Sequence, residues 1–290
     1  MIVRLEKSLL IVILMEEVNM DELSFEEWLN IKGITIIGQH FSYDRNISKN
    51  DIISQINLIV ELQKALLGCS FNELNRIKST IGKEVESYKV QIRRLQKHYD
   101  YIFNRTCTNE IENFILSNGK IMLTQAVNAL NYIDEHDYFG VIRRSMNRSE
   151  ICLGKVDKNN LRRNKNKIEI GTVKAMTYNL VEEDLYNYIK RLQRKEFDID
   201  EEELLKAFVY GSHLSYNSID YLKGLLSYPK DFLKVWERYR NSKKGRITSM
   251  YHTLNISSME CEENEKEKNE AEALLELKRS LKYESKSFIV

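Results

Sequence analysis

A long apolar stripe between residues 74 and 102 constrains the fold of this chain more than any other feature. Its members recur at steps of three or four residues, as on one face of a helix: Leu74, Ile77, Ile81, Val85, Tyr88, Ile92, Leu95, Tyr99 and Ile102. The stripe predicts one long helix, and the apolar pattern of residues 111–133 predicts a second helix that packs against it. A free coiled coil is the alternative arrangement. One proline and 11 glycines among 290 residues leave few positions that interrupt helices.

Shorter periodic segments predict an α+β protein that is predominantly helical. The segment from Ser48 to Gly68 has an N-cap candidate, an apolar face and a terminating glycine, which together predict a helix. Strands are expected at residues 34–37 and 168–170, and further helices at residues 185–192, 198–210, 219–228 and 229–240. Pro229 is expected to be the first residue of the last helix. The helix of residues 185–192 is expected to expose a basic side that carries Lys190, Arg191, Arg194 and Lys195.

The amino-acid composition limits the kinds of function that the chain can have. The charged side chains comprise 44 basic and 43 acidic residues, a formal net charge of +1, so no global positive field is available to attract nucleic acid. A local basic segment, Arg162, Arg163, Lys165 and Lys167, is interpreted as a solvated loop. A hydrophobic fraction of 42% is sufficient for a sizeable core. We therefore expect a folded protein without a nucleic-acid partner.

Cysteine and histidine give no indication of a metal site or a disulfide framework. The four cysteines are Cys69, Cys107, Cys152 and Cys261, with no Cys-x-x-Cys pair among them, and the five histidines lack ligand spacing. This usage fits a reducing cytosol. The apolar residues 9–15 are too few to span a bilayer, and no small-residue cleavage site follows them. We expect a buried strand there, or an over-assigned start with Met15 or Met20 as the true start, and no membrane association.

Residues 150–192 carry an ordered set of motifs. Residues 153–160 read Leu-Gly-Lys-Val-Asp-Lys-Asn-Asn, an apolar strand with Ile168 and Ile170 follows, and residues 172–174 read Thr-Val-Lys. The order resembles the active-site region of kinase-like phosphotransferases of the aminoglycoside and choline kinase type. In that family, His-Gly-Asp-x-x-x-x-Asn precedes a strand that ends in Asp-Phe-Asp or Asp-Trp-Glu. The resemblance places Leu153, Gly154, Lys155 and Asn160 on the first motif, Thr172, Val173 and Lys174 on the second, and Asp184 on an Asp-Leu that opens the next helix.

The chemistry of the family's motifs is missing at these positions. In the family, the Asp of the first motif is the catalytic base, and the Asp that opens the second holds magnesium on the nucleotide phosphates. Lys155 replaces the base with a cation that only donates hydrogen bonds, and Thr172 and Lys174 replace the metal-binding acids. Asp157 is the one nearby carboxylate and is two positions out of register. The resemblance therefore implies no catalytic residue, no bound metal and no cofactor.

A second resemblance, in residues 227–244, indicates one branch of this superfamily. Residues 227–244 read Ser-Tyr-Pro-Lys-Asp-Phe-Leu-Lys-Val-Trp-Glu-Arg-Tyr-Arg-Asn-Ser-Lys-Lys. They resemble the Phe/Tyr-Pro-x-Lys-Phe-Trp, Asn-Arg-Tyr-Tyr-Asn and basic ending of the spore coat protein S (CotS) family of endospore-forming bacteria. The positions that carry this structural motif are Pro229, Phe232, Trp236, Arg238 and Tyr239, with the tryptophan shifted in register. Trp236 is interpreted as a core anchor, with substrate stacking as the alternative. The two resemblances together cover residues 50–245.

The resemblance implies three parts of the chain. Residues 1–48 are expected to be a truncated remnant of the kinase amino-terminal lobe, because they are too few for its strands and helix and contain no glycine-rich loop. Residues 49–256 are expected to form the helical, kinase-like carboxyl-terminal lobe. Residues 257–290, rich in Glu and Lys, are expected to be a charged, partly helical tail. We expect this tail to be a solvated helix or partly disordered, and to contact a partner.

The function implied by the resemblance is that of a catalytically inactive kinase-like protein that binds other spore coat proteins during coat assembly. It would act in the cytoplasm of the mother cell, with the assembled coat as a further location. Lys155 and Lys174 would bind an anion where the family binds magnesium, or they are solvated at a vestigial rim. The alternatives are an active small-molecule phosphotransferase that uses Asn160, Asp157 or Asp184, and a purely structural helical scaffold.

Overall fold

The structure, a computed structural model, describes residues 24–43, 47–69, 74, 77–105, 108–250 and 259–285. Its helices are α2 (Phe25–Ile31), α3 (Lys49–Leu66), α4 (Lys83–Phe103), α5 (Glu110–Glu135), α6 (Tyr138–Arg148), α7 (Glu182–Arg194), α8 (Glu201–Gly211), α9 (Tyr216–Ser227), α10 (Lys230–Met250) and α11 (Met259–Glu284). Its strands are β1 (Ile34–Ile36), β2 (Ile151–Cys152), β3 (Leu161–Asn164), β4 (Lys167–Ile170) and β5 (Thr177–Tyr178). This content confirms the predominantly helical α+β class. Residues 9–15 lie outside the described residues.

The strands form two small sheets. In the first, β4 lies between β3 and β1, antiparallel to β3 and parallel to β1, so that Glu169 stands opposite both Arg162 and Thr35. Strands β2 and β5 form the second, antiparallel sheet. The basic segment interpreted as a loop is therefore a hairpin, with Lys165 in its turn at a φ of 54°. The interpretation as a loop was wrong because the polar, solvent-facing residues of a strand resemble a loop in sequence.

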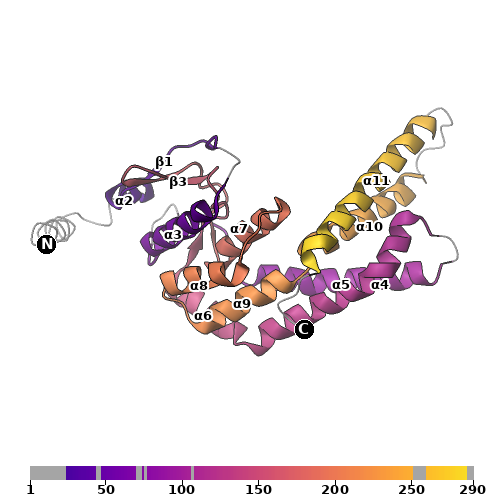
Figure 1. Ribbon diagram of the computed structural model, residues 1–290, viewed down its shortest axis with the longest axis horizontal. Coiled ribbons are helices and arrows are strands. Elements are labelled where there is room, and N and C mark those ends of the chain that lie inside the picture. The colour runs from indigo at the N-terminus through magenta and orange to yellow at the C-terminus, as the bar shows by residue number, and fades with distance from the viewer. Residues whose placement is uncertain are drawn as a thin grey trace, which may run out of the picture.

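The first described residues add one helix and one strand to that hairpin. Helix α2 begins with a capping box, in which the Glu27 N–H donates to Ser24 Oγ and the Ser24 N–H donates to the Glu27 carboxylate. Trp28 and Leu29 bury its inner face. Parallel pairing of β1 with β4 then attaches this segment to the hairpin. Figure 1 shows α2 and β1 together at one end of the molecule. That residues 1–48 are a truncated lobe remains an expectation.

Helix α3 supports the loop between β2 and β3. It begins at Lys49, as predicted, because Ser48 and Asp51 form a second capping box. From its buried face, the Gln55 amide donates to the carbonyls of Val156 (2.7 Å) and Leu161 (3.0 Å). These bonds satisfy one backbone acceptor within the loop and one at the start of β3, so the helix fixes the loop's position.

Helices α4 and α5 are the predicted long pair, but α4 begins later than the apolar stripe suggests. Gly82 takes a left-handed conformation (φ 77°) just before Lys83, the first helical residue. Residues 78–80 pair instead with Tyr178 of β5: Thr80 N donates to its carbonyl at 2.9 Å, and its N–H donates to Lys78 O at 3.1 Å. The chain before Gly82 therefore extends the second sheet, which a helical period cannot reveal.

The last helix packs into the body of the protein, contrary to the expectation of a solvated or partly disordered tail. Figure 1 shows α10 and α11 side by side. Leu277 of α11 is fully buried, and the buried Glu284 carboxylate lies 3.1 Å from Lys190 Nζ. The same carboxylate accepts the N–H groups of Asp231 (2.9 Å) and Phe232 (2.8 Å) at the start of α10. Residues 269–285 are therefore part of the fold.

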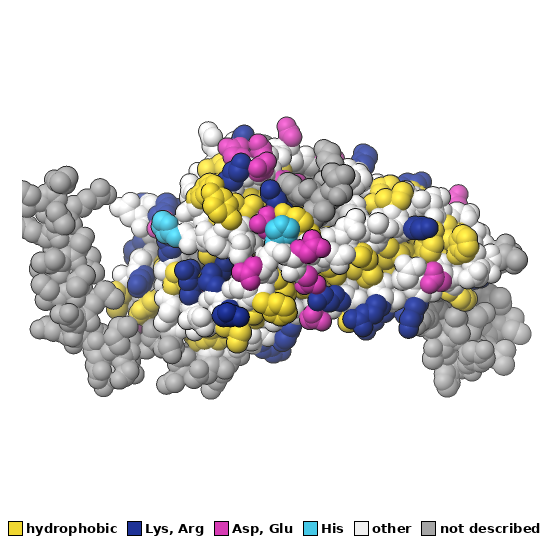
Figure 2. Space-filling view, turned by 90° about the horizontal axis from the view of Figure 1, so that it is seen from below, with side chains coloured by type: hydrophobic (Ala, Val, Ile, Leu, Met, Phe, Trp, Pro, Cys, Tyr) yellow, Lys and Arg dark blue, Asp and Glu magenta, His cyan; other side chains and the backbone are white. Residues whose placement is uncertain are grey.

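The surface carries charges of both signs. Figure 2 shows basic, acidic and apolar side chains interspersed on one face, which fits the near-zero net charge. None of the described helices is long and apolar enough to cross a membrane.

Candidate functional site

The loop of residues 153–160 carries the first of the two motifs that the resemblance aligns with the phosphotransferases. It leaves β2 and enters β3, and Gly154 takes a left-handed conformation at its start (φ 77°). A Cβ at Gly154 would lie 2.6 Å from the Ala175 carbonyl oxygen, so a larger residue would collide with the segment after β4. The glycine therefore allows residues 153–155 and 172–176 to approach each other closely.

Asp184 holds the beginning of this loop. Its carboxylate is buried in the first turn of α7 and accepts the N–H of Leu153 (2.9 Å) and of Gly154 (2.8 Å). Burial raises the pKa of Asp184 to about 6, even though both N–H donors favour the ionised form. The resemblance placed Asp184 correctly at the opening turn of a helix, and its contacts give it a structural role in shaping the loop.

Asn160 joins the loop to the segment after β4. Its buried amide NH₂ donates to the carbonyls of Lys155 (2.9 Å) and Thr172 (3.0 Å), and its Oδ1 accepts the Thr172 N–H at 2.8 Å. The two motifs aligned by the resemblance therefore meet in space. Because both amide hydrogens and the amide oxygen already have backbone partners, this side chain is engaged in holding the loop.

Asp157 is the one carboxylate of the loop, and it is neutralised by an ion pair. Its Oδ1 accepts from Arg191 Nη1 of α7 at 2.8 Å, and its Oδ2 accepts the Asn159 N–H at 3.3 Å. The geometry therefore gives Asp157 a structural contact and no free position facing a substrate.

Lys155 and Lys174 lie at the surface of the site. Both side chains are exposed, and neither ammonium has an ion-pair partner among the described residues. Thr172, which the resemblance aligns with a metal-binding Asp, accepts the Lys174 N–H through its hydroxyl at 3.2 Å. Within the described part of the chain, no group of three His, Cys, Asp or Glu side chains is arranged to hold a metal ion.

A buried ion network lies behind the loop and was not anticipated. The Arg144 guanidinium donates to both carboxylate oxygens of Glu150 (3.0 and 2.9 Å) and to both of Glu182 (2.8 Å each), and it also reaches Ser218 Oγ. Both carboxylates are fully buried. Glu150 directly precedes β2 and Glu182 opens α7, so this fork of hydrogen bonds fixes the two elements that present the loop and Asp184.

A polar cavity of about 380 Å³ lies beside Gly154, and sequence reasoning missed the residues that form it. We call it the loop cavity. It opens between the first turn of α4, strand β5 and the first turn of α7, and its lining includes Glu84, Ser87, Thr177, Asn179, Glu183 and Asn187. Burial and the nearby Glu84 carboxylate raise the pKa of Glu183 to about 8. The one available signal was the acidic run of residues 182–184, which reads as an ordinary solvated first turn.

The motif of residues 227–244 lies largely inside the molecule. Trp236 is fully buried, and its Nε1 donates to His98 Nδ1 of α4 at 2.9 Å. Tyr239 OH contacts Glu112 of α5 at 3.3 Å. Phe232 is buried at the start of α10, which directly follows Pro229, and Arg238 pairs at the surface with Glu276 of α11. These positions pack α10 against α4, α5 and α11 and contribute no side chain to the loop cavity.

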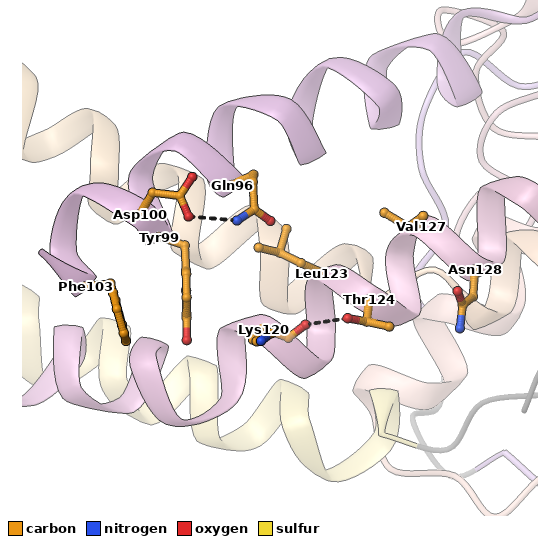
Figure 3. Close-up of a pocket in the computed structure, with 9 residues that line it drawn as sticks. All are labelled: Gln96, Tyr99, Asp100, Phe103, Lys120, Leu123, Thr124, Val127 and Asn128. Atoms are coloured by element: carbon orange, nitrogen blue, oxygen red, sulfur yellow. Dashed lines mark hydrogen bonds between the residues drawn. The ribbon is translucent and has the colours of Figure 1, made fainter.

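A second cavity of about 440 Å³ lies between α4 and α5 (Figure 3). Its walls carry apolar side chains, with Tyr99 and Phe103 on α4 and Leu123 and Val127 on α5, and the figure shows Asp100 hydrogen bonded to Gln96 along its edge. No residue of the 153–160 loop lines it.

Comparison with known proteins finds a similar fold among solved structures. No family model and no curated protein matches the chain. The structure is similar to that of an aminoglycoside phosphotransferase from Alicyclobacillus acidocaldarius subsp. acidocaldarius, with a TM-score of 0.56 and 10% sequence identity. The match covers 81% of this chain and 63% of the other, so the chain spans less than two thirds of that protein's length. The kinase-like fold implied by the resemblance is thereby shown, and at this identity the likeness concerns the fold alone.

Proposed function

We propose that this chain is a catalytically inactive kinase-like protein that acts by binding other proteins in spore coat assembly. The observation that supports catalytic inactivity is the hydrogen bonding of the Asn160 side chain. At the position that aligns with Asn160, the phosphotransferases have a polar side chain that binds the metal. In this chain, both amide hydrogens and the amide oxygen of Asn160 are already hydrogen bonded to the backbone of Lys155 and Thr172. The neighbouring acid positions hold Lys155, Thr172 and Lys174, and like charge at the two lysines repels a magnesium ion.

The binding half of the proposal rests on the resemblance of residues 227–244 to the spore coat protein S family. That resemblance implies a partner among the other coat proteins, action in the cytoplasm of the mother cell and assembly into the coat. A fluorescent fusion produced in a sporulating, endospore-forming host should accumulate around the forespore. Uniform fluorescence throughout the mother cell and in vegetative cells would contradict the coat assignment.

A thermal shift titration with ATP, with and without magnesium, tests the inactivity. A ligand that binds only the folded state must raise the melting temperature. We expect no magnesium-dependent shift and no ATP turnover. A magnesium-dependent shift would show that the site holds a metal–nucleotide complex and would overturn the proposal. The informative variant is Asn160→Asp, which offers a carboxylate to a metal; we expect it to be less stable and still unresponsive to magnesium.

The ammonium groups of Lys155 and Lys174, which are exposed and have no ion-pair partner among the described residues, support one additional role, binding of an anion at the position where the family binds metal. Two cations close to a backbone loop would attract phosphate or sulfate. Titration with inorganic phosphate should then show saturable binding that disappears in the Lys155→Ala Lys174→Ala variant. Lys165→Ala Lys167→Ala, on the exposed β3–β4 hairpin, is the matched control. Equal affinities in both double variants, or no binding at all, would leave both lysines as solvated surface residues.

A further inference from the structure

The cavity of about 440 Å³ between α4 and α5, which we call the helix-pair cavity, lies at the surface between apolar walls (Figure 3). Every residue that lines it belongs to one of these two helices. Two of its apolar side chains are largely accessible: Phe103 is 67% exposed and Val127 is 41% exposed. The Tyr99 ring stacks near that of Phe103, with centroids 6.3 Å apart, and extends the apolar surface along α4. Exposed apolar side chains that are grouped in this way indicate a contact surface, whereas isolated ones do not.

Two charged side chains of opposite sign stand on the two walls of the helix-pair cavity. Asp100 belongs to α4 and Lys120 to α5, as Figure 3 shows. Both are exposed, and neither has an ion-pair partner among the described residues. The Asp100 carboxylate accepts a hydrogen bond from the neutral Gln96 amide at 2.9 Å. The cavity therefore separates an acidic wall from a basic wall, and the two charges do not neutralise each other.

The two charges lie at about the same level along the helix pair. Helices α4 and α5 run antiparallel, since Lys89 Nζ lies 3.7 Å from the Asp134 carboxylate at one end and Tyr99 OH donates to the Leu116 carbonyl at 3.1 Å near the other. Counting along both helices from the first contact puts the carboxylate slightly to one side of the ammonium, and counting from the second puts it slightly to the other side. The two residues are therefore opposite each other to within about one helical turn.

We propose that the helix-pair cavity is the contact surface of a homodimer. A two-fold axis that runs along the groove between the helices lays α4 of each copy over α5 of the other. Because Asp100 and Lys120 share one level, this symmetry places each Asp100 opposite the partner's Lys120. Two identical ion pairs then flank an apolar centre formed by Phe103 and Val127 of both copies. An isologous contact requires a surface that is complementary to itself in this way.

A second copy of the chain fits both walls at once. A purely acidic partner would be attracted by Lys120 and repelled by Asp100, and a purely basic partner would meet the reverse. The formal net charge of +1 produces little repulsion between two copies. Self-association through this surface goes beyond the proposed binding of coat proteins and does not depend on it, so each proposal is tested by its own experiment.

Sedimentation equilibrium of the full chain tests the dimer. We expect a reversible equilibrium between monomer and dimer that depends on protein concentration. A monomer at all concentrations up to about 100 μM would overturn the proposal, because specific interfaces of ordinary size bind in the micromolar range or more tightly. That result would leave the cavity to a ligand or to a different protein. An open-ended series of larger species would indicate a heterologous contact and would also overturn it.

A charge exchange tests the location of the contact. Asp100→Lys and Lys120→Asp each place like charges opposite one another in the dimer, so each should weaken dimerisation at least about 10-fold at low ionic strength. The double variant restores opposite charges and should dimerise within about 3-fold of the wild type. Both side chains are exposed, so all three variants should fold with unchanged circular dichroism.

Lys234→Asp is the matched control for these variants. It makes the same change of charge at an exposed residue of α10 that does not line the helix-pair cavity, and it should leave the dissociation constant of the dimer unchanged. Three results would overturn the proposal: no weakening in either single variant, equal weakening in the control, or a double variant that is no better than the single ones.

Discussion

The ammonium of Lys190 lies 3.1 Å from the carboxylate of Glu284, and both side chains are almost completely buried. The pair joins α7, which carries Asp184, to the end of α11, 94 residues later in the chain. Because Glu284 also accepts two N–H groups at the start of α10, its single carboxylate fixes three helices relative to one another.

Replacing Glu284 with Ala should destabilise the protein strongly. The change leaves the buried Lys190 cation without a partner and removes the acceptor of the α10 N-terminus, so we expect a loss of about 3–5 kcal/mol in the free energy of unfolding, measured by urea denaturation. Arg279→Ala breaks an exposed pair with Glu196 and should cost about 0–1 kcal/mol. A loss for Glu284→Ala as small as for this control would mean that α11 does not dock as described.

The stability of the protein should fall as the pH rises towards 8, because of Glu183. The pKa of this carboxyl is about 8 in the folded state, against an ordinary value of 4.5, so the folded protein binds the proton more tightly between these limits. The stabilisation is full below pH 4.5 and is lost as the pH rises through 8, at a rate of up to about 1.4 kcal/mol per pH unit.

The Glu183→Gln variant carries a neutral isostere and should remove much of this slope in urea denaturation measured at several pH values. Glu86→Gln, on the exposed side of α4, is the control and should keep the wild-type slope. Identical slopes in the wild type and in Glu183→Gln would mean that Glu183 does not bind its proton with raised affinity.

Asn160→Ala should lower the free energy of unfolding by about 2–4 kcal/mol, since three hydrogen bonds to the backbone of Lys155 and Thr172 are lost inside the protein. The comparison is Asn164→Ala on the exposed hairpin, which loses one bond to Glu169 and should change stability by about 0.5 kcal/mol or less. If both variants were equally stable by denaturant titration, the structural role of the Asn160 amide would be refuted.

Gly224→Ala should destabilise the contact between α5 and α9. A Cβ at Gly224 would overlap Ile133 Cγ1 and lie 3.3 Å from the Ala129 carbonyl oxygen, so the helices would have to separate. We expect a net loss of about 1–3 kcal/mol in thermal or urea unfolding, although alanine by itself favours a helix by about 1 kcal/mol. Gly119→Ala, whose Cβ would lie 3.1 Å from the Trp236 ring, should show a smaller loss. A stabilised Gly224→Ala would disprove this packing.

The local elements were largely predictable, because their signals lie within a few residues of one another. Ser48 and Asp51 cap α3 at the predicted position. The first residues of the apolar stripe were assigned to the wrong element, since Gly82 ends the extended segment and Tyr178, almost 100 residues later, supplies its partner. The interpretation of Lys190 as part of an exposed basic side failed for the same reason: its burial depends on Glu284.

The sequence by itself determined the helical character and the order of the two motifs, and it placed Lys155, Thr172 and Lys174 at positions that the resemblance aligns with acids. These are properties of residue types and of short-range periodicity. Only the tertiary structure decided that Asn160 and Thr172 bond to each other, that Arg144 joins Glu150 to Glu182, and that a polar cavity lies beside Gly154. Each of those features combines residues from separate elements, and burial and pairing between distant segments leave no fixed spacing in a single sequence.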